Sequence, residues 1–245
     1  MKTLVLFICV FLIYGSAKSQ GLYDITSGDA SMVIACGKNG IILRSTNSGN
    51  NWTSTINGSV DLFSVCSISS TYWITGAGGV CLKSTDSGLS WSQQQTNTTS
   101  SLKSIYFLDN LTGWAAGSAG VILRSTNGGV NWSQQSSGTS SDLNSIKFSS
   151  SSTGFVCGKS GILLRSTNGG SNWSPLNTGT ARELFSVDIK NNVVMVSGEY
   201  STALRSTNSG ASWSAIDYKQ ITLSDINSVF MQDENTYFSC GGGGF

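Results

Sequence analysis

The sequence predicts an all-β chain, a β-propeller of four-stranded antiparallel blades with about 40 residues per blade. The main observation is a motif, S-T-[ND]-x-G-x-x-W, that occurs five times in the 245 residues. The motif tryptophans are separated by 39, 41, 41 and 40 residues and are Trp52, Trp91, Trp132, Trp173 and Trp213. A nearly constant period of this length indicates an array of similar structural units.

Composition and local patterning support the same class. The chain has 29 glycines and one proline, is 39% hydrophobic and only 11% charged, and shows no long apolar pattern of helical period. These values favour many short strands joined by tight turns, with almost no helix.

The fourth repeat illustrates the expected strands. Residues 143–148 alternate as a first strand, and residues 154–157 form a second. A tight glycine turn at 158–161 leads into a third strand at 162–166, and a fourth begins near Trp173. The aliphatic runs at 41–43, 121–123 and 162–164 are expected to be third strands buried on both faces.

Five complete repeats and a partial sixth account for the chain after its first residues. We expect repeats at 22–60, 61–101, 102–142, 143–183 and 184–224, followed by a partial repeat at 225–245. Residues 240–245 align with 36–41, where a third strand begins. A half-built sheet leaves open edges, so we expect the sequence to be truncated at its C-terminus.

The first 19 residues differ from the repeats and have the pattern of a secretory signal. Lys2 precedes an apolar run at 4–14, and small residues at positions 17 and 19 suit cleavage after Ser19. The run is shorter than the roughly 20 residues that span a bilayer. We therefore expect residues 20–245 to be exported, to an extracellular, periplasmic or lumenal location, without a membrane anchor.

Charge and cysteine usage exclude several kinds of site. Removal of Lys2 and Lys18 leaves 12 basic and 13 acidic residues, thinly spread, which argues against nucleic-acid binding.

Cys36, Cys157 and Cys240 share one position before a glycine, as expected for small core residues. The chain has no histidine and no C-x-x-C pair, so we expect no zinc site and no other metal or cofactor. A disulfide between Cys66 and Cys81 is left open.

The repeated motif resembles the Asp-box, also called the bacterial neuraminidase repeat, in which a short polar side chain caps the turn between a blade's third and fourth strands. Asp86 keeps the aspartate, and asparagines take its place at Asn47, Asn127, Asn168 and Asn208. Either side chain accepts hydrogen bonds from the turn, in which glycine takes a positive φ. The motif tryptophan should pack on the turn, so we interpret the motif as structural.

The whole repeat is similar to the photosystem II stability and assembly factor family of propellers. The similarity rests on L-x-S-[IV]-x-F, then T-G-[WF], then G-x-x-G-[IV]-[IL]-L-R-S-T-N-G-G-x-x-W, and is strongest at residues 102–129. It implies a propeller over residues 22–245. Members from photosynthetic organisms act as lumenal chaperones for reaction-centre subunits, so it also implies a protein-binding scaffold.

Enzyme chemistry finds little support. A sialidase needs an arginine trio and a tyrosine nucleophile, and the R-I-P opening of such enzymes is missing because the only proline is Pro175. The absence of histidine removes Ser-His-Asp and Cys-His catalysis. The acids Asp61, Asp142, Glu183 and Asp225 recur at one repeat position, which a structural role predicts.

Two residue sets are candidates for partner binding. One set stands at the end of each third strand and comprises Arg44, Lys83, Arg124, Arg165 and Arg205. Packing between blades is the alternative role for these long side chains. The other set lies on the variable turns between second and third strands and comprises Lys38, Lys159, Glu199 and Tyr200.

The sequence thus predicts an exported, non-catalytic propeller that binds another protein. A carbohydrate-binding or sialidase-like glycosidase propeller is the alternative, favoured by the Asp-box kinship and by Glu199 and Tyr200.

Overall fold

The structure is a computed structural model that describes residues 21–29, 31–216 and 224–242. Over these residues it contains strands and four short 3-10 turns, with no α-helix, as the composition predicts. The predicted signal at 1–19 and the last residues, 243–245, lie outside the described part of the chain.

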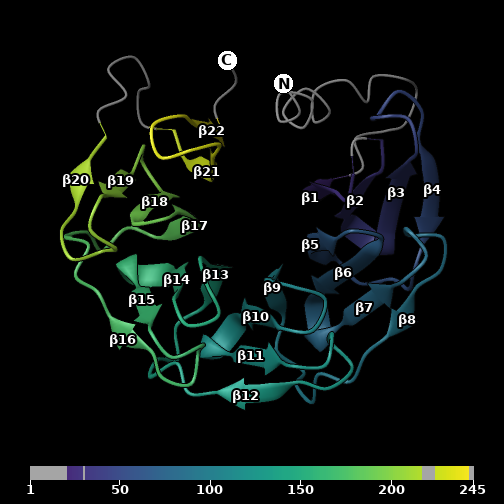
Figure 1. Cartoon of the computed structure of the whole chain (residues 1–245), viewed down its shortest axis with the longest axis horizontal. Helices are drawn as coiled ribbons and strands as arrows, with labels where there is room; N and C mark the ends of the chain where they lie inside the picture. The colour runs from purple at the N-terminus through teal and green to yellow at the C-terminus, as the bar shows by residue number, and fades with distance from the viewer. Residues whose placement is uncertain (1–20, 30, 217–223, 243–245) are drawn as a thin grey trace. The chain divides into compact units, whose positions relative to one another are not determined.

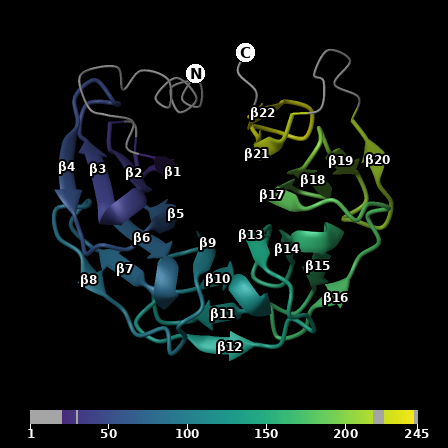
Figure 2. The same cartoon turned by 180° about the vertical axis from the view of Figure 1, so that it is seen from behind.

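Each complete repeat forms one four-stranded sheet, and the strands of a sheet lie side by side in chain order (Figures 1 and 2). The first sheet comprises β1 (Leu22–Ser27), β2 (Val33–Gly37), β3 (Ile41–Ser45) and β4 (Thr53–Ile56). The second comprises β5 (Leu62–Ile68), β6 (Thr71–Gly76), β7 (Cys81–Ser84) and β8 (Ser92–Gln93). The third comprises β9 (Leu102–Phe107), β10 (Gly113–Gly117), β11 (Ile122–Ser125) and β12 (Ser133–Gln135).

The later repeats follow the same plan. The fourth sheet comprises β13 (Leu143–Phe148), β14 (Gly154–Gly158), β15 (Leu163–Ser166) and β16 (Ser174–Pro175). The fifth comprises β17 (Leu184–Lys190), β18 (Val193–Gly198), β19 (Ala203–Ser206) and β20 (Ser214–Ala215). The sixth repeat contributes a two-stranded sheet of β21 (Ile226–Met231) and β22 (Tyr237–Gly241). The strands predicted for the fourth repeat therefore agree with the structure to within a residue or two.

The chain divides into two compact units. One comprises residues 1–115 with 125–133, and the other comprises residues 116–124 with 134–245. The first unit holds the first two sheets, and the second holds the fourth and fifth sheets with the β21–β22 pair.

A β-bulge recurs at the start of the first strand of the blade. The register between first and second strands shifts between Leu62 and Ser64, and again between Leu143 and Ser145 and between Leu184 and Ser186. A bulge places one extra residue in one strand and re-aims the side chains beside it. The leucine before each shift is fully buried, and the serine after it accepts a hydrogen bond from an amide of the next blade.

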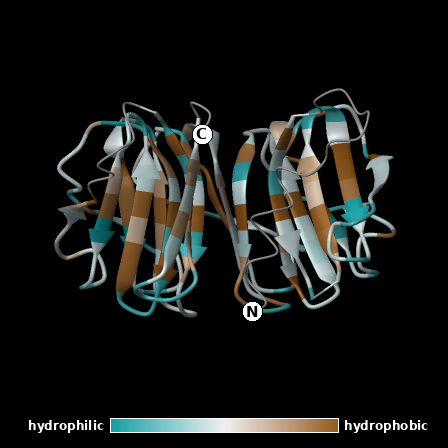
Figure 3. Cartoon of the chain, turned by 90° about the horizontal axis from the view of Figure 1, so that it is seen from above, coloured by the Kyte–Doolittle hydropathy of each residue, from teal (hydrophilic) through white to brown (hydrophobic). Residues whose placement is uncertain are grey.

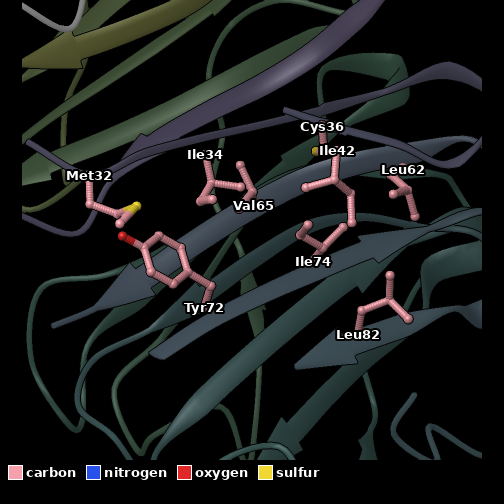
Figure 4. Packing of buried hydrophobic residues seen from close by; sticks show 9 residues of the cluster. All are labelled: Met32, Ile34, Cys36, Ile42, Leu62, Val65, Tyr72, Ile74 and Leu82. Carbon is pink, nitrogen blue, oxygen red and sulfur yellow. The ribbon is translucent and has the colours of Figure 1, made fainter. Parts of the chain in front are cut away.

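The cores lie between neighbouring blades of the same unit. In the first unit, Ile34, Cys36 and Ile42 of the first sheet pack against Leu62, Val65, Tyr72, Ile74 and Leu82 of the second (Figure 4). In the second unit, Phe155 and Leu163 pack similarly against Val187, Val194 and Val196. Apolar residues follow the strands, while the connecting turns are polar (Figure 3). Burial on both faces explains the uninterrupted aliphatic runs of the third strands.

Cys66 and Cys81 do not form a disulfide, and the described cysteines contain none. Cys66 lies on β5 and Cys81 on β7, and β6 pairs with both strands. Two strand spacings separate such residues by roughly 9–10 Å, beyond the reach of a disulfide. Cys36 and Cys157 are buried, as predicted for small core residues, and Cys81 is buried as well. The same prediction was wrong for Cys240, which is exposed because it lies on β22, the last strand of a two-stranded sheet with no third strand beside it among the described residues.

Thiol alkylation should distinguish these cysteines. Burial raises the pKa of the Cys81 thiol to about 12 and also raises the pKa of Cys36 and Cys157, so few thiolates form in the folded chain. Exposed Cys240 should react with iodoacetamide at least about tenfold faster than these three, although partial burial also raises its pKa. Peptide mass spectrometry before and after unfolding measures the difference. Fast labelling of Cys81 or Cys157 in the native chain would contradict the buried placement.

Candidate functional site

The motif turns between third and fourth strands share one hydrogen-bond pattern. In the first repeat, the Ser45 hydroxyl donates to Asn47 Oδ1 (3.0 Å) and accepts from the amide of Gly49 (2.9 Å). The amide of Asn51 then donates to Asn47 Oδ1 (2.8 Å). The same three bonds recur in the other motifs, and the motif glycines have φ between 79° and 87°. The polar groups of the motif are therefore used within the turn.

The motif tryptophan completes this turn and links it to the first strand. Trp132 packs edge-on against Phe107, and Trp173 packs in the same way against Phe148, with ring centroids 5.8 Å apart in both pairs. The glycine of T-G-[WF] makes room for the phenylalanine: a Cβ on Gly154 would lie 2.5 Å from the Phe148 ring. The constant spacing of the L-x-S-[IV]-x-F, T-G-[WF] and S-T-[ND]-x-G-x-x-W motifs within a repeat thus reflects one packed cluster of their phenylalanine, glycine and tryptophan residues.

Asp86 is the only carboxylate among the five motifs, and its two oxygens accept four hydrogen bonds. It accepts hydrogen bonds from the hydroxyls of Ser84 (2.7 Å) and Ser90 (2.6 Å) and from the amides of Leu89 and Ser90. The bonds from Ser90 contribute most to lowering the pKa of Asp86, followed by the bond from Ser84. The carboxylate is therefore a structural acceptor that stays ionised well below neutral pH.

Four of the five basic side chains, those of Arg44, Lys83, Arg124 and Arg205, lie against a turn of the following blade. Arg44 Nε donates to the carbonyl of Ser87 (2.7 Å), and Arg205 Nη2 donates to the carbonyl of Glu234 in the β21–β22 turn (2.9 Å). The charged ends of Lys83 and Arg124 lie close to glycines of the next motif turn. A Cβ added to Gly128 would lie 3.1 Å from Lys83 Nζ, and one added to Gly169 would lie 3.5 Å from Arg124 Nη2. Lys83 and Arg165 also lie over the rings of Trp73 and Phe155. All five side chains are half-buried, so much of their length packs between blades.

The recurring acids join two neighbouring blades. Asp61 starts the second blade, where its carbonyl accepts from Ala77, and its carboxylate accepts from the amide of Asn39 in the first blade (3.0 Å). Asp142 repeats the arrangement, with its carbonyl bonded to Lys159 and its carboxylate to Ala119 (3.0 Å).

The later acids keep this bridging role. Asp225 binds Gly242 through its carbonyl and Tyr200 through its carboxylate (3.1 Å). Glu183, with its longer side chain, instead accepts from Asn144 Nδ2 (2.8 Å). Because these carboxylates are bonded at equivalent places in successive blades, they do not form the unrepeated pair that a glycosidase needs.

The variable turns between second and third strands share one closely packed backbone conformation. Asn39, Ala119, Ser160 and Tyr200 occupy one tip position, and all have φ between 50° and 59°. A glycine follows in four of the blades, and a Cβ on Gly79, Gly120 or Gly161 would lie 2.0 Å from the carbonyl oxygen of Thr98, Thr139 or Thr180. The tip side chains are exposed, so they can vary without disturbing the turn.

The candidates on these turns have different partners. Lys159 Nζ pairs with Asp142 (3.0 Å), and Glu199 accepts from the amide of Glu183 (2.9 Å). Lys38 is exposed beside Gly21. Tyr200 is 54% exposed and forms the one large aromatic tip among the described blades.

Arg182 accompanies Tyr200 and was missed by the sequence reasoning. Its guanidinium lies 5.5 Å from the Tyr200 ring centroid, and Nη1 donates to the Tyr200 carbonyl (3.0 Å). The equivalent positions hold Val60, Ser100, Ser141 and Ser224, so the departure from the repeat is visible in the sequence. Ser201, with φ of 57°, likewise replaces the turn glycine. The fifth blade therefore departs from the repeat at three positions that meet at one turn.

Two properties of the described residues bear on metal binding and on membrane insertion. No cluster of three or more histidine, cysteine, aspartate or glutamate residues suits a metal ion in the described part of the chain. Over the same residues, no helix has the length and apolar character needed to cross a membrane.

Comparison with known proteins identifies the type of fold. Residues 125–235 match a family model described as photosynthesis system II assembly factor YCF48, which covers less than half of the chain. No curated protein matches in sequence. The solved structure "YCF48 bound to D1 peptide" is 19% identical, with a TM-score of 0.62, and the alignment covers 91% of this chain and 89% of that one.

Two further structures share the fold. YCF48 from Cyanidioschyzon merolae is 15% identical with a TM-score of 0.54, over 93% of this chain and 94% of that one. The GH74 xyloglucanase from Xanthomonas campestris is 11% identical with a TM-score of 0.73, over 91% of this chain but only 44% of that one. The similarity predicted from the repeat is confirmed: the chain has the β-propeller fold of the two YCF48 structures, and residues 125–235 match the assembly-factor family model.

The charge of Asp86 should make one contribution to stability depend on pH. Its folded-state pKa lies below the ordinary value of 3.8, so its stabilisation is complete above that value and is lost as pH falls through the folded pKa. Asp86→Asn, which copies the other four motifs, should be less stable than the natural chain near neutral pH. The two proteins should converge in acid.

Denaturant midpoints from about pH 7 to about pH 2 measure this difference. Asn127→Asp is the matched control, because it adds the carboxylate to the equivalent turn. A gap between the natural chain and Asp86→Asn that stays constant with pH would contradict the proposed role of the charge.

Proposed function

We propose that this chain is an exported, non-catalytic scaffold of the assembly-factor type that binds another protein. The observation that carries the proposal is the division between repeated and unrepeated polar groups. The repeated serines, asparagines and acids are bonded to turns and to neighbouring blades. The unrepeated exposed side chains stand on closely packed turns, an arrangement that suits recognition.

Tyr200 is the main candidate contact. An exposed aromatic side chain with few rotatable bonds loses little entropy on binding, and tyrosine and arginine are common at interface hot spots. Arg182 already orients the ring through its stacking contact and its bond to the Tyr200 carbonyl. Lys38, Lys159 and Glu199 are further candidates on equivalent turns.

The basic set is a secondary candidate. Arg44 donates to the carbonyl of Ser87 through Nε, and Arg205 donates to the carbonyl of Glu234 through Nη2. Since a guanidinium has five N–H donors, the same side chain can also receive a partner carboxylate. Removal of these side chains would disturb blade packing as well, so they are poor choices for a first test.

The likeness to assembly factors supports a peptide ligand. One solved assembly factor of this fold is described as bound to a D1 peptide. We therefore use the D1 peptide as the first probe for this chain.

Export to a lumenal, periplasmic or extracellular location, with cleavage near Ser19, is part of the proposal and is tested by N-terminal sequencing of the native protein.

Carbohydrate binding or cleavage is the second candidate, because xyloglucanase propellers share the fold. Those matches span under half of the longer enzyme, and the recurring acids here bond to turns and neighbouring blades. Titration with a xyloglucan oligosaccharide and measurement of new reducing ends test this alternative. Sugar release by the purified chain would overturn the non-catalytic proposal.

Tyr200→Asn should separate binding from stability. Asparagine is the natural tip residue of the first blade and tolerates a left-handed backbone, so stability should be unchanged or higher by up to about 1 kcal/mol. Affinity for the D1 peptide should fall at least about tenfold, because the aromatic contact is lost. Calorimetric titration and thermal unfolding measure the two effects.

Ser160→Asn is the matched control, since it introduces the same residue at the tip of the neighbouring blade and should leave affinity unchanged. Equal affinity of Tyr200→Asn and the natural chain would remove Tyr200 from the proposed site. Failure of the natural chain to bind the D1 peptide, together with failure to cross-link any protein in its native compartment, would contradict the scaffold proposal itself.

A further inference from the structure

The fourth strand of the first blade differs from its counterparts. β4 has four residues and pairs with β3 at four positions, from Arg44 with Thr53 to Ile41 with Ile56. The other fourth strands, β8, β12, β16 and β20, have only two or three residues. β4 ends its sheet, and no described strand pairs with its outer edge. It is thus the longest open edge among the described fourth strands.

The outward backbone groups of this edge follow from its register. The amide of Asn57 donates to the carbonyl of Gly40 (2.8 Å), so Asn57 faces β3. In an antiparallel pair, the N–H and C=O of one residue point to the same side, and successive residues alternate. Thr53 and Thr55 therefore also face β3, whereas Ser54 and Ile56 direct their N–H and C=O groups outward.

β4 lacks the usual protection of an exposed edge. Natural edge strands carry lysine, proline or bulges that prevent pairing with another chain. β4 reads Thr-Ser-Thr-Ile, without charge or proline, and all four side chains are exposed. The fourth blade shows the protected form of the same position: Pro175 pairs with Leu164 as Ser54 pairs with Leu43. The proline removes the outward N–H that Ser54 keeps.

We infer that β4 binds an extended, uncharged peptide segment of the protein partner as a fifth strand of the first blade. This inference rests on the proposed function, since it assumes that the partner is a protein. Alternating outward donors and acceptors at Ser54 and Ile56 match the backbone of an extended peptide. The Ile56 side chain, 71% exposed, offers an apolar contact beside them.

A peptide fits this edge better than a second copy of the chain. A standard stable interface buries about 800 Å² per partner, far more than a four-residue strand can provide. A short peptide strand needs only the edge and the neighbouring isoleucine. The absence of charge in β4 favours a segment that is itself uncharged, because a charged one would lose solvation without gaining an ion pair.

The test uses the capped peptide acetyl-Thr-Val-Thr-Ile-Thr-Val-amide and the full chain, isotope-labelled for NMR. Peptide binding should shift the amide signals of Ser54 and Ile56 and slow their hydrogen exchange about tenfold or more. The same peptide with N-methyl groups on alternate residues should not bind, because it lacks the pairing donors. Shifts confined to other parts of the chain, or none at β4, would overturn the inference.

Ser54→Pro copies the fourth blade and removes one outward N–H without removing a bond to β3. It should weaken peptide binding about tenfold, whereas Ser54→Ala, which keeps the N–H, should bind as the natural chain does. Unchanged thermal midpoints would show that both variants are folded. Equal binding by Ser54→Pro would overturn the inference.

Two outcomes separate this inference from the proposed function. A dimer of the natural chain that dissociates in Ser54→Pro would show that a second copy occupies the edge, and would overturn the peptide assignment alone. Binding of the D1 peptide that is lost in Tyr200→Asn but unchanged in Ser54→Pro would keep the scaffold proposal and remove β4 from it.

Discussion

The hydrogen bond that joins the first strands of neighbouring blades is the contact on which this architecture depends. A first strand is a sheet edge, and its outward N–H groups need acceptors. The preceding blade supplies these acceptors, and donor and acceptor are 41 residues apart in the chain, close to one repeat. Asp24 accepts from Val65 (2.9 Å), and Ser64 accepts from Ile105 (3.3 Å). Ser145 and Ser186 do the same for Val187 and Val229. The bulge at the start of each first strand directs these acceptors toward the next blade.

This requirement explains why so many of the polar side chains are repeated from blade to blade. The serine of L-x-S, the serine and asparagine of the motif turn, and the acid before the first strand all bond to backbone groups. The basic side chains extend across the blade boundary to the next turn. In the proposed function, recognition uses positions at which one blade departs from the others, namely the Tyr200 turn and the β4 edge. The repeats serve as internal references, since each departure can be compared with the same position in other blades.

The sequence was sufficient to predict most of the local structure, because period-2 strands, glycine turns and the five motifs are local signals. It indicated the first strand at residues 143–148 and the positive φ of the motif glycines. Contacts between blades were harder to predict. The acids were recognised as repeated, but their bonds to the previous blade's turn depend on spatial neighbours. Arg182 was missed because its role depends on Tyr200, which is 18 residues away in the chain. The suggested Cys66–Cys81 disulfide failed because an intervening strand separates the two residues.

Native-state amide hydrogen exchange of Val65, Ile105, Val187 and Val229 tests the central claim most directly. These four amides lie at sheet edges, and each donates to a side chain of the preceding blade. The account predicts protection comparable to that of amides inside the sheets, with Ser186→Ala accelerating exchange at Val229 but not at Val65. Exchange of all four amides as fast as in exposed turns would contradict it, because the first strands of neighbouring blades would then not be joined by these hydrogen bonds.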